Sequence, residues 1–274
     1  AVGLTLIFGI VKVINFAHGE FLMVGMYLSF LLSTGLDVHP YLTAAAVAPA
    51  LFVLGALTQR LLIQPLMSAR DEHVQIFATV GLSTALMNLA LLIFGADIAN
   101  TPAHGVRSQV MLGEVRILTG QLWVLAAAVA LVIGLQLFMK KTRTGRAIRA
   151  TAQNRAAARL MGINDKFIYI LTFGIGAACV GLGSSLIAPL YPTSPTIGTY
   201  FVLIAFVCVV LGGLGSIPGA FFGALVIGLV DALSGFYIGS DLREAVVFTI
   251  FLLILILKPS GLFGTRMNLS HVSP

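Results

Sequence analysis

Long stretches without Asp, Glu, Lys or Arg are the feature that most limits what this chain can fold into. They cover residues 21–36, 38–59, 74–96, 117–139, 167–230 and 245–257. A bilayer core about 30 Å thick needs about 20 apolar residues in a helix, so most of these stretches hold at least one span. Only 9% of the residues are charged and 58% are apolar, far from the roughly 25% charged residues of soluble domains. These proportions exclude a soluble fold.

The longest stretch is divided by helix breakers. Pro189, Pro192 and Pro195 interrupt it first, and the glycine-rich segment 212–219 interrupts it again. We therefore predict an all-α, polytopic transmembrane bundle of about eight spans, with one helix broken near 212–219. The expected spans are 16–36, 38–60, 74–95, 119–139, 166–188, 199–213, 217–236 and 241–258.

The N-terminal residues form a shorter apolar segment. Residues 2–11 have the composition of the second half of a spanning helix, and the chain begins at Ala1 rather than at a methionine. No basic region or cleavage site of a signal peptide is present there. We expect a truncated first span, a single transmembrane domain over residues 1–264, and a tail at 265–274.

Basic residues predict the orientation. Eight of the sixteen cations lie between residues 140 and 166, where Asp165 is the only acid. The positive-inside rule makes this loop cytoplasmic. By alternation, the 60–73 segment and the tail are then cytoplasmic, and the 96–120 loop is external. The net charge of +6 reflects these loops between apolar runs, so it does not indicate a nucleic-acid partner.

The middle of the basic loop is rich in helix-forming residues. The segment TAQNRAAARLM at 151–161 is followed by Gly162, which predicts a short cytoplasmic helix. A solvated loop against lipid headgroups is one interpretation. The other is a docking helix that transmits force from a soluble partner through an apolar strip of Ala158, Leu160, Met161 and Ile163.

Four motifs resemble a known family when they are taken in order along the chain. They are GLTLIFGIVKVINFAHGEFLMVGMYL at 3–28, GRAIRATAQNRAAARLMGI at 145–163, LGGLGSIPGAFFGAL at 211–225 and KPSGLFG at 258–264. Together they resemble the inner-membrane permeases of high-affinity branched-chain amino acid ABC importers. The missing front of the first span is a departure from that pattern.

The resemblance implies a transport subunit of a bacterial inner membrane that hydrolyses nothing itself. Its implied partners are a second permease subunit, two ATPase subunits and a periplasmic substrate-binding protein. The residues of the implied ATPase-coupling segment are Gly145, Arg146, Arg149, Arg155, Ala158, Arg159, Leu160, Gly162 and Ile163. No GxxxxGK[ST] phosphate loop occurs, so ATP has to be bound by another chain, and we expect no cofactor or metal in this one.

Small residues recur along the segment after the predicted break. Gly215, Gly219 and Gly223 are spaced four apart, beside a second stripe that starts at Ala220. Small faces let helix backbones approach closely in lipid, so we expect this helix to be central. Gly212, Gly213, Gly215 and Gly219 are also candidates for lining a substrate path where backbone is unwound. Ordinary tight packing is the alternative.

Polar residues within predicted spans are the remaining candidates for the substrate path. Asp231 lies toward the outer end of its span, where it either contacts the interface, lines the path or pairs with Arg243. Asn88 is typical of an interhelical hydrogen bond. Asn15, His18 and Glu20 are predicted at the cytoplasmic end of the 16–36 span, as capping and gate-lining residues. Cys179 and Cys208 lie in uncharged stretches and are expected to be buried and inert.

Alternatives to branched-chain amino acid import remain open. A permease of the same class for urea or short amides fits the motifs equally well. An ion-coupled secondary transporter would need acidic and basic relays along several spans, and only Asp231 is a candidate. A membrane enzyme would need a nucleophile, a base or metal ligands in the core, and the sequence shows no such set.

Overall fold

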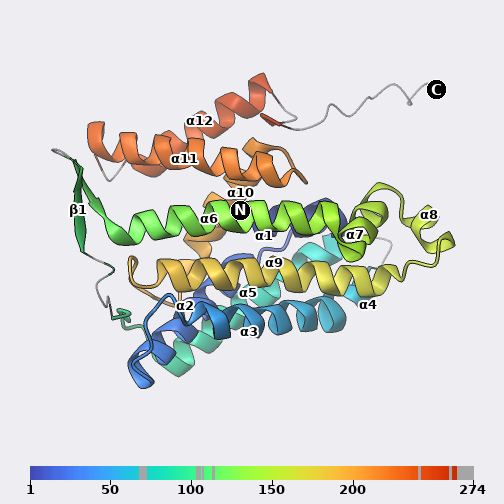
Figure 1. The fold of residues 1–274 in the computed structure, drawn as a ribbon, viewed down its shortest axis with the longest axis horizontal. Coiled ribbons are helices and arrows are strands. Elements are labelled where there is room, and N and C mark those ends of the chain that lie inside the picture. The colour runs from blue at the N-terminus through green and yellow to red at the C-terminus, as the bar shows by residue number, and fades with distance from the viewer. Residues whose placement is uncertain are drawn as a thin grey trace.

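The computed structural model describes residues 1–67, 73–102, 106, 108–112, 115–239, 242–258 and 261–263. Helices dominate the described chain, and a short hairpin interrupts them (Figure 1). The elements are α1 (Val2–Val11), α2 (His18–Gly35), α3 (Ala44–Leu57), η1 (Thr58–Ile63), α4 (Gln64–Leu66), α5 (His73–Phe94), β1 (Gln109–Leu112), β2 (Val115–Leu118), α6 (Thr119–Lys141), α7 (Arg143–Gln153), α8 (Arg155–Leu160), α9 (Asp165–Ile187), α10 (Ile197–Gly212), α11 (Ile217–Tyr237) and α12 (Arg243–Leu257).

The polytopic helical bundle is confirmed, and a helix occupies each of the eight predicted span ranges. Five helices among the described residues are long and apolar enough to cross a bilayer alone, namely Ala44–Leu66, α5, α6, α9 and α11. The helices α10 and α1 are apolar but shorter. The total of eight spans therefore stays a prediction.

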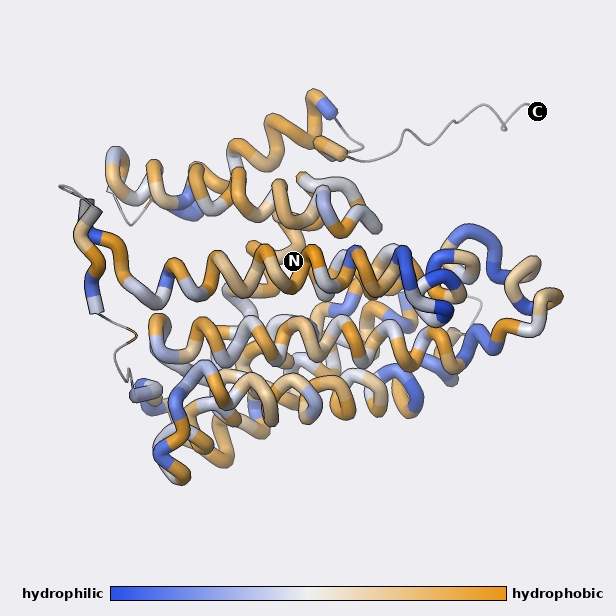
Figure 2. The backbone as a smooth tube through the Cα atoms, in the orientation of Figure 1, coloured by the Kyte–Doolittle hydropathy of each residue, from blue (hydrophilic) through white to orange (hydrophobic). Residues whose placement is uncertain are grey.

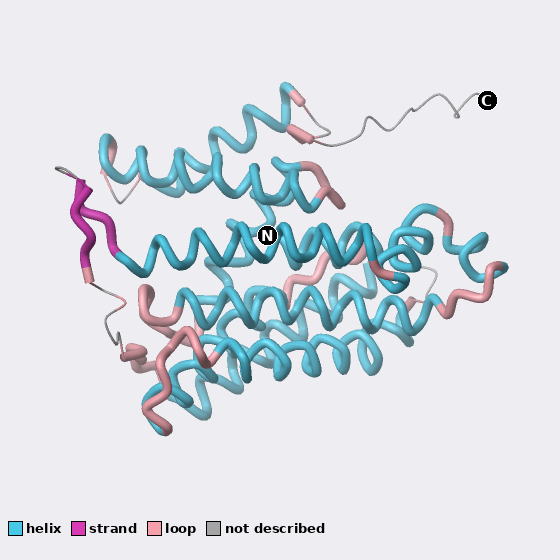
Figure 3. The backbone as a smooth tube through the Cα atoms, in the orientation of Figure 1, coloured by secondary structure: helices cyan, strands magenta, loops and turns pink. Residues whose placement is uncertain are grey.

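The 96–120 loop contains an antiparallel hairpin, so the expectation of an all-α chain is wrong in this segment. β1 pairs with β2 in the register Gln109 to Leu118 and Leu112 to Val115. The hairpin lies at the end of the bundle opposite to α7 and α8 (Figure 3). Short strands of this kind satisfy backbone hydrogen bonds outside the apolar spans.

The helix at the centre of the bundle is α9, and not α11 as the small-residue stripe predicted. In Figure 1, α11 and α12 lie along one edge, α3 lies along the other, and α9 lies between. α9 packs along α3 and also against α1 and α2. Within the most apolar window of each helix, 56% of the residues of α9 are buried, against 33% for α11.

Glycines on α9 explain why its neighbours approach so closely. A Cβ atom added to Gly176 would lie 2.7 Å from the side chain of Ile7, and one added to Gly181 would lie 2.8 Å from the Cα of Ala48. On α3, a Cβ added to Gly55 would lie 2.5 Å from the Cβ of Ala177. The same close-packing chemistry thus operates on α9, and it buries this helix on more sides than α11.

Polar residues gather at the end of the bundle formed by α7 and α8 (Figure 2). This end contains the basic segment that the positive-inside rule makes cytoplasmic. Two other segments are predicted to be cytoplasmic, 60–73 and the tail at 265–274. Residues 68–72 of the first, and residues 264–274, lie outside the described residues.

Candidate functional site

Two helices begin inside the bundle and meet at a pair of glycines. A Cβ atom added to Gly19 of α2 would lie 2.1 Å from the carbonyl oxygen of Gly198 in α10. A Cβ added to Gly198 would lie 2.4 Å from Oε2 of Glu20. Only glycine at both positions lets the first turns of α2 and α10 touch with the Glu20 carboxylate between them.

The crossing lies near the middle of the bundle. A Cβ added to Gly3 would lie 2.3 Å from the carbonyl oxygen of Gly176 and 3.3 Å from Cε1 of His18. Gly176 is the central residue of α9, which runs from Asp165 to Ile187. The prediction that His18 and its neighbours lie at the cytoplasmic end of a span is therefore wrong, because α2 starts inside the bundle after the chain returns from α1.

The three polar residues of this segment are almost completely buried. The exposed fractions are 0% for Asn15, 3% for His18 and 1% for Glu20. Oε1 of Glu20 accepts a hydrogen bond of 3.3 Å from the Ser83 hydroxyl of α5, and Oδ1 of Asn15 accepts one of 3.1 Å from the Ala17 amide. Oε2 of Glu20, Nδ2 of Asn15 and both ring nitrogens of His18 have no hydrogen-bond partner among the described residues.

The side chains of His18 and Glu20 do not converge on one point. They are two residues apart on α2, so they lie on nearly opposite sides of the helix. His18 lies against Gly3 of α1, whereas Glu20 lies between Gly198 of α10 and Ser83 of α5. The polar site is therefore centred on Glu20, and it extends to α5 and α10.

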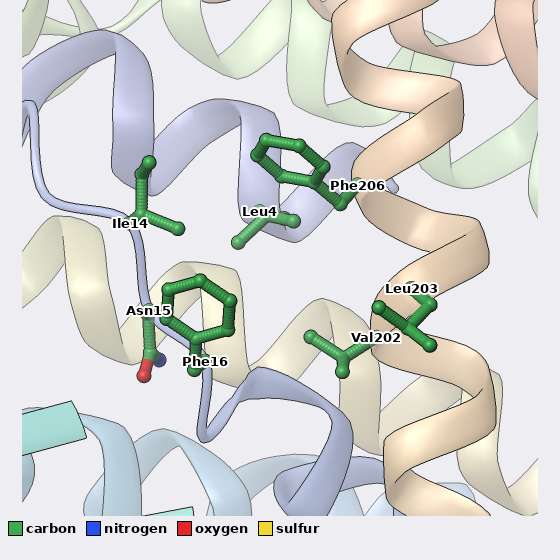
Figure 4. A pocket seen from close by; sticks show the side chains of 7 residues that line it. All are labelled: Leu4, Ile14, Asn15, Phe16, Val202, Leu203 and Phe206. Atoms are coloured by element: carbon green, nitrogen blue, oxygen red, sulfur yellow. The ribbon is translucent and has the colours of Figure 1, made fainter. Parts of the chain in front are cut away.

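A small hollow lies beside this site, between the segment that precedes α2 and the face of α10. Figure 4 shows Leu4, Phe16, Val202 and Phe206 around it, while the Asn15 amide points away. The full lining is Leu4, Ile14, Asn15, Phe16, Val202, Leu203 and Phe206. The hollow is thus almost entirely apolar, and Asn15 is the polar residue of its lining.

The predicted break near 212–219 is present, and the four glycines there have different environments. α10 ends at Gly212, and Gly213 and Gly215 adopt φ values of 99° and 86° before α11 begins. A Cβ on Gly219 would lie 2.2 Å from the carbonyl oxygen of Gly212, so these two glycines let α10 and α11 touch. Gly215 lies in the connecting turn, against Gly9 of α1.

Asp231 and Asn88 are placed away from the Glu20 site. Both carboxylate oxygens of Asp231 accept hydrogen bonds from the Arg243 guanidinium, so α11 and α12 are joined by an ion pair. Asn88 is exposed on α5, and its amide donates a 2.8 Å hydrogen bond to the Thr84 carbonyl of its own helix. Among the described residues, no hydrogen bond or ion pair joins either side chain to Glu20.

The basic segment folds as two helices, so the single helix predicted over 151–161 is wrong. Asn154 has an extended backbone and ends α7, and its side chain accepts a 3.0 Å hydrogen bond from the Ala157 amide at the start of α8. At the other end of α7, a Cβ on Gly145 would lie 2.3 Å from the Phe138 carbonyl oxygen. Ile148 is fully buried and holds α7 against the bundle.

The second helix, α8, is fixed to the start of α9 by charge. Asp165 accepts hydrogen bonds of 2.6 Å from both Arg155 and Arg159, and the Arg155 guanidinium lies 5.1 Å from the centre of the Tyr169 ring. These contacts tie α8 to α9 in one unit.

The expected apolar strip of α8 is divided. Ala158 is 4% exposed and Ile163 is half-buried, whereas Leu160 and Met161 are 89% and 82% exposed. Arg146 and Arg149 are exposed on α7, and Gly162 has φ 80° in the turn that follows α8. Leu160 and Met161 therefore form an exposed apolar pair at the end of α8, next to the exposed Arg159.

Two residues of the site were missed by sequence reasoning. Ser83 is one of the hydroxyl residues in an apolar span, and the sequence around it contains no motif that indicates a site. Gly198 follows three prolines and lies in the first turn of α10. A glycine in a first turn was the available signal of a close backbone approach. Among the described residues, no group of three or more His, Cys, Asp or Glu side chains is arranged to hold a metal ion.

Comparisons with known proteins agree on one family. The model of the family described as branched-chain amino acid transport system / permease component matches residues 1–257. The chain is 32% identical over 278 residues to the high-affinity branched-chain amino acid transport system permease protein LivH of Escherichia coli (strain K12), covering 96% of this chain and 90% of LivH.

Two further relatives show how far the similarity extends. BraD of Pseudomonas aeruginosa, named as a permease of the same kind of system, is 33% identical over 277 residues, covering 96% of this chain and 90% of BraD. The ribose import permease protein RbsC of Escherichia coli (strain K12) is 38% identical over 97 residues, which cover 33% of this chain and 30% of RbsC. No solved structure gives a significant match.

Proposed function

The chain belongs to the family of branched-chain amino acid transport system permease components, and we propose that it forms half of the pathway of an ATP-driven importer for leucine, isoleucine and valine. It is a multi-pass membrane permease, and a bacterial inner membrane is the location that this function requires. Residues 1–264 would form one permease domain. ATP would be hydrolysed by a separate chain.

The observation that carries this proposal is a buried polar site in the middle of an apolar bundle. Glu20, Ser83 and the first turn of α10 meet where α2 and α10 cross. A substrate path needs few polar groups at this depth, because a polar residue in a membrane interior is costly unless it has a function or a partner. His18 lies on the α1 side of α2, so it would not share the Glu20 site, and Asn15 would stabilise the turn before α2 through its hydrogen bond with the Ala17 amide.

The other candidates take different roles in this proposal. Gly212, Gly213, Gly215 and Gly219 would provide a compact, unwound junction on which α10 and α11 tilt during alternating access. Asp231 would hold α11 to α12 through Arg243 rather than contact the substrate. Asn88 would face a neighbouring subunit, since an exposed amide at membrane depth is better satisfied by protein than by lipid.

The ATPase subunits would bind at the α7 and α8 end. The exposed Leu160 and Met161 supply apolar contact, and the arginines of α7 and α8 supply charge. Because Asp165 joins α8 to the first turn of α9, a push on α8 would move the central helix of the bundle. Two ATPases, a second permease and a substrate-binding protein at the hairpin end would complete the assembly.

This docking proposal predicts the effect of two polar substitutions. Leu160→Asp with Met161→Asp should release the ATPase from the purified complex, because it removes the exposed apolar contact without touching a buried residue. Co-purification of the ATPase measures this, and Leu61→Asp, at another exposed apolar position near the same end, is the control. Deleting 151–162 is a poorer test, since Thr151 and Ala158 are buried.

Labelled-substrate uptake by the complete importer in proteoliposomes tests the function itself. ATP-dependent uptake of leucine in preference to urea or acetamide is the expected result. Uptake of urea but not leucine would favour the permease for urea or short amides. Leucine uptake driven by an ion gradient without ATP would indicate an ion-coupled secondary transporter and would refute the ABC importer.

A further inference from the structure

The Glu20 carboxylate is a buried acid with one oxygen left without a partner. The side chain is 1% exposed, Ser83 donates to Oε1, and the Thr199 hydroxyl of α10 lies close to the carboxylate, while Oε2 accepts no hydrogen bond of good geometry within the described chain. The ion pairs found among the described residues involve Asp165 and Asp231 and not Glu20. Burying an ionised carboxylate without a counter-charge is costly, so a buried acid with no cationic partner needs an explanation.

The first turn of α10 explains how the carboxylate can stay charged. This helix has 16 residues, and its N-cap residue Thr196 makes no side-chain hydrogen bond to the first turn. The uncapped N-terminus carries a partial positive charge that favours a nearby anion. A Cβ added to Gly198 would lie 2.4 Å from Oε2, so the carboxylate lies against this turn. When ionised, a carboxylate in this position presents the lone pairs of Oε2 to a cationic donor.

On the premise of the proposed function, we infer that Glu20 binds the primary ammonium group of the amino acid as it passes the crossing of α2 and α10. An ammonium offers three N–H donors and a full positive charge, so it supplies both the missing hydrogen bond and the missing counter-charge. Urea and acetamide supply only neutral donors. Glu20 thus selects for amino acids over the uncharged cargo of the alternative function.

Uptake by the complete importer gives the first test. Glu20→Gln keeps the shape and removes the charge, so leucine uptake should fall about tenfold or more. Glu20→Asp should recover part of the loss, and Glu244→Gln, an exposed carboxylate at the start of α12, should behave as wild type. Wild-type uptake in the Glu20→Gln importer would overturn this inference and leave the proposed function intact.

Ligand-induced thermal stabilisation gives a second test that does not depend on transport. The purified importer without its binding protein should be stabilised by a few degrees by 3-methylbutylamine, but not by 4-methylpentanoate or sodium chloride. Glu20→Gln should abolish this response. Stabilisation by 4-methylpentanoate alone, an equal response to sodium chloride, or an unchanged amine response in Glu20→Gln would each overturn the ammonium site.

The two tests separate this inference from its premise. Failure of the proposed function appears in the wild-type importer, as absence of ATP-dependent leucine uptake. Failure of the ammonium site appears as a missing difference between the wild type and Glu20→Gln, or as a wild-type thermal response that does not favour the amine, while ATP-dependent leucine uptake by the wild type persists. A Glu20→Gln chain that does not assemble is recognised by loss of co-purifying subunits, and Glu20→Asp then carries the comparison.

Discussion

Two buried carboxylates in this chain have opposite surroundings. Asp165, at the end of the bundle, is 5% exposed and accepts hydrogen bonds from two arginines. Glu20, in the middle, is 1% exposed, receives a hydrogen bond from the Ser83 hydroxyl and has the Thr199 hydroxyl nearby. The first has the contacts of a structural joint, where both cationic partners are supplied by the fold. The second has no cationic partner among the described residues, which is the property of a binding group.

The largest effect should come from moving the Glu20 carboxylate. Gly198→Val places side-chain atoms where Oε2 of Glu20 lies, 2.4 Å from a Cβ at this position. We expect uptake to be lost completely, a fall of about a hundredfold or more, because both the carboxylate and the crossing of α2 and α10 are displaced. Leucine uptake measures this, and Gly228→Val on α11, which has open space, is the matched control. Normal uptake by Gly198→Val would remove Glu20 from the site.

A second large effect is expected where α10 touches α11. A Cβ at position 219 would lie 2.2 Å from the Gly212 carbonyl oxygen, so the side chain of Gly219→Leu would push α10 away from α11. Because α10 also carries Gly198, this shift would disturb the Glu20 site. Uptake should be abolished while the protein still inserts, as membrane fractionation would show. Gly228→Leu should insert and transport. If Gly219→Leu transports normally, the close approach of α10 and α11 is not required.

The smallest effect should come from the paired carboxylate. Asp165→Asn removes the charge from two hydrogen bonds. Because Arg155 and Arg159 are half-exposed and remain hydrated, the local stability of α8 should fall by only about 1–3 kcal/mol. Hydrogen exchange of α8 measures this loss, and leucine uptake should fall only severalfold. The sign with pH follows from the ion pair: the contribution is present while Asp165 is ionised and is lost on its protonation. A loss of uptake as large as that of Gly198→Val would erase the distinction between the two carboxylates.

The sequence predicted the helices better than their depth. Charge-free runs located the helices because apolar length is a local property of the chain, and the glycine break near 212–219 was also local. His18 and Glu20 were predicted at the cytoplasmic end of a span because helices were expected to start at the membrane interface. The contact of Gly19 with Gly198 joins segments about 180 residues apart, and no local pattern encodes it.

Small-residue spacing was informative but not unique. The stripe on α11 indicated close packing, which occurs at Gly219 and Gly223, yet Gly228 meets no neighbouring atom within 4 Å. The most buried of the five helices long enough to span a bilayer, α9, contains glycines in a less regular spacing. The break at Asn154 was missed because the helix propensity of the surrounding alanines and arginines outweighed the capping preference of a single asparagine.

Accessibility of a single cysteine at residue 199 tests the account most directly. Thr199 is exposed in the first turn of α10, next to the Glu20 site, and the native thiols of Cys179 and Cys208 are buried. In the assembled importer, a membrane-impermeant thiol reagent added from the binding-protein side should modify Thr199→Cys at rates that differ at least about fivefold between the nucleotide-free and ATP-trapped states. Equal rates in the two states would contradict a substrate path that opens alternately at the crossing of α2 and α10.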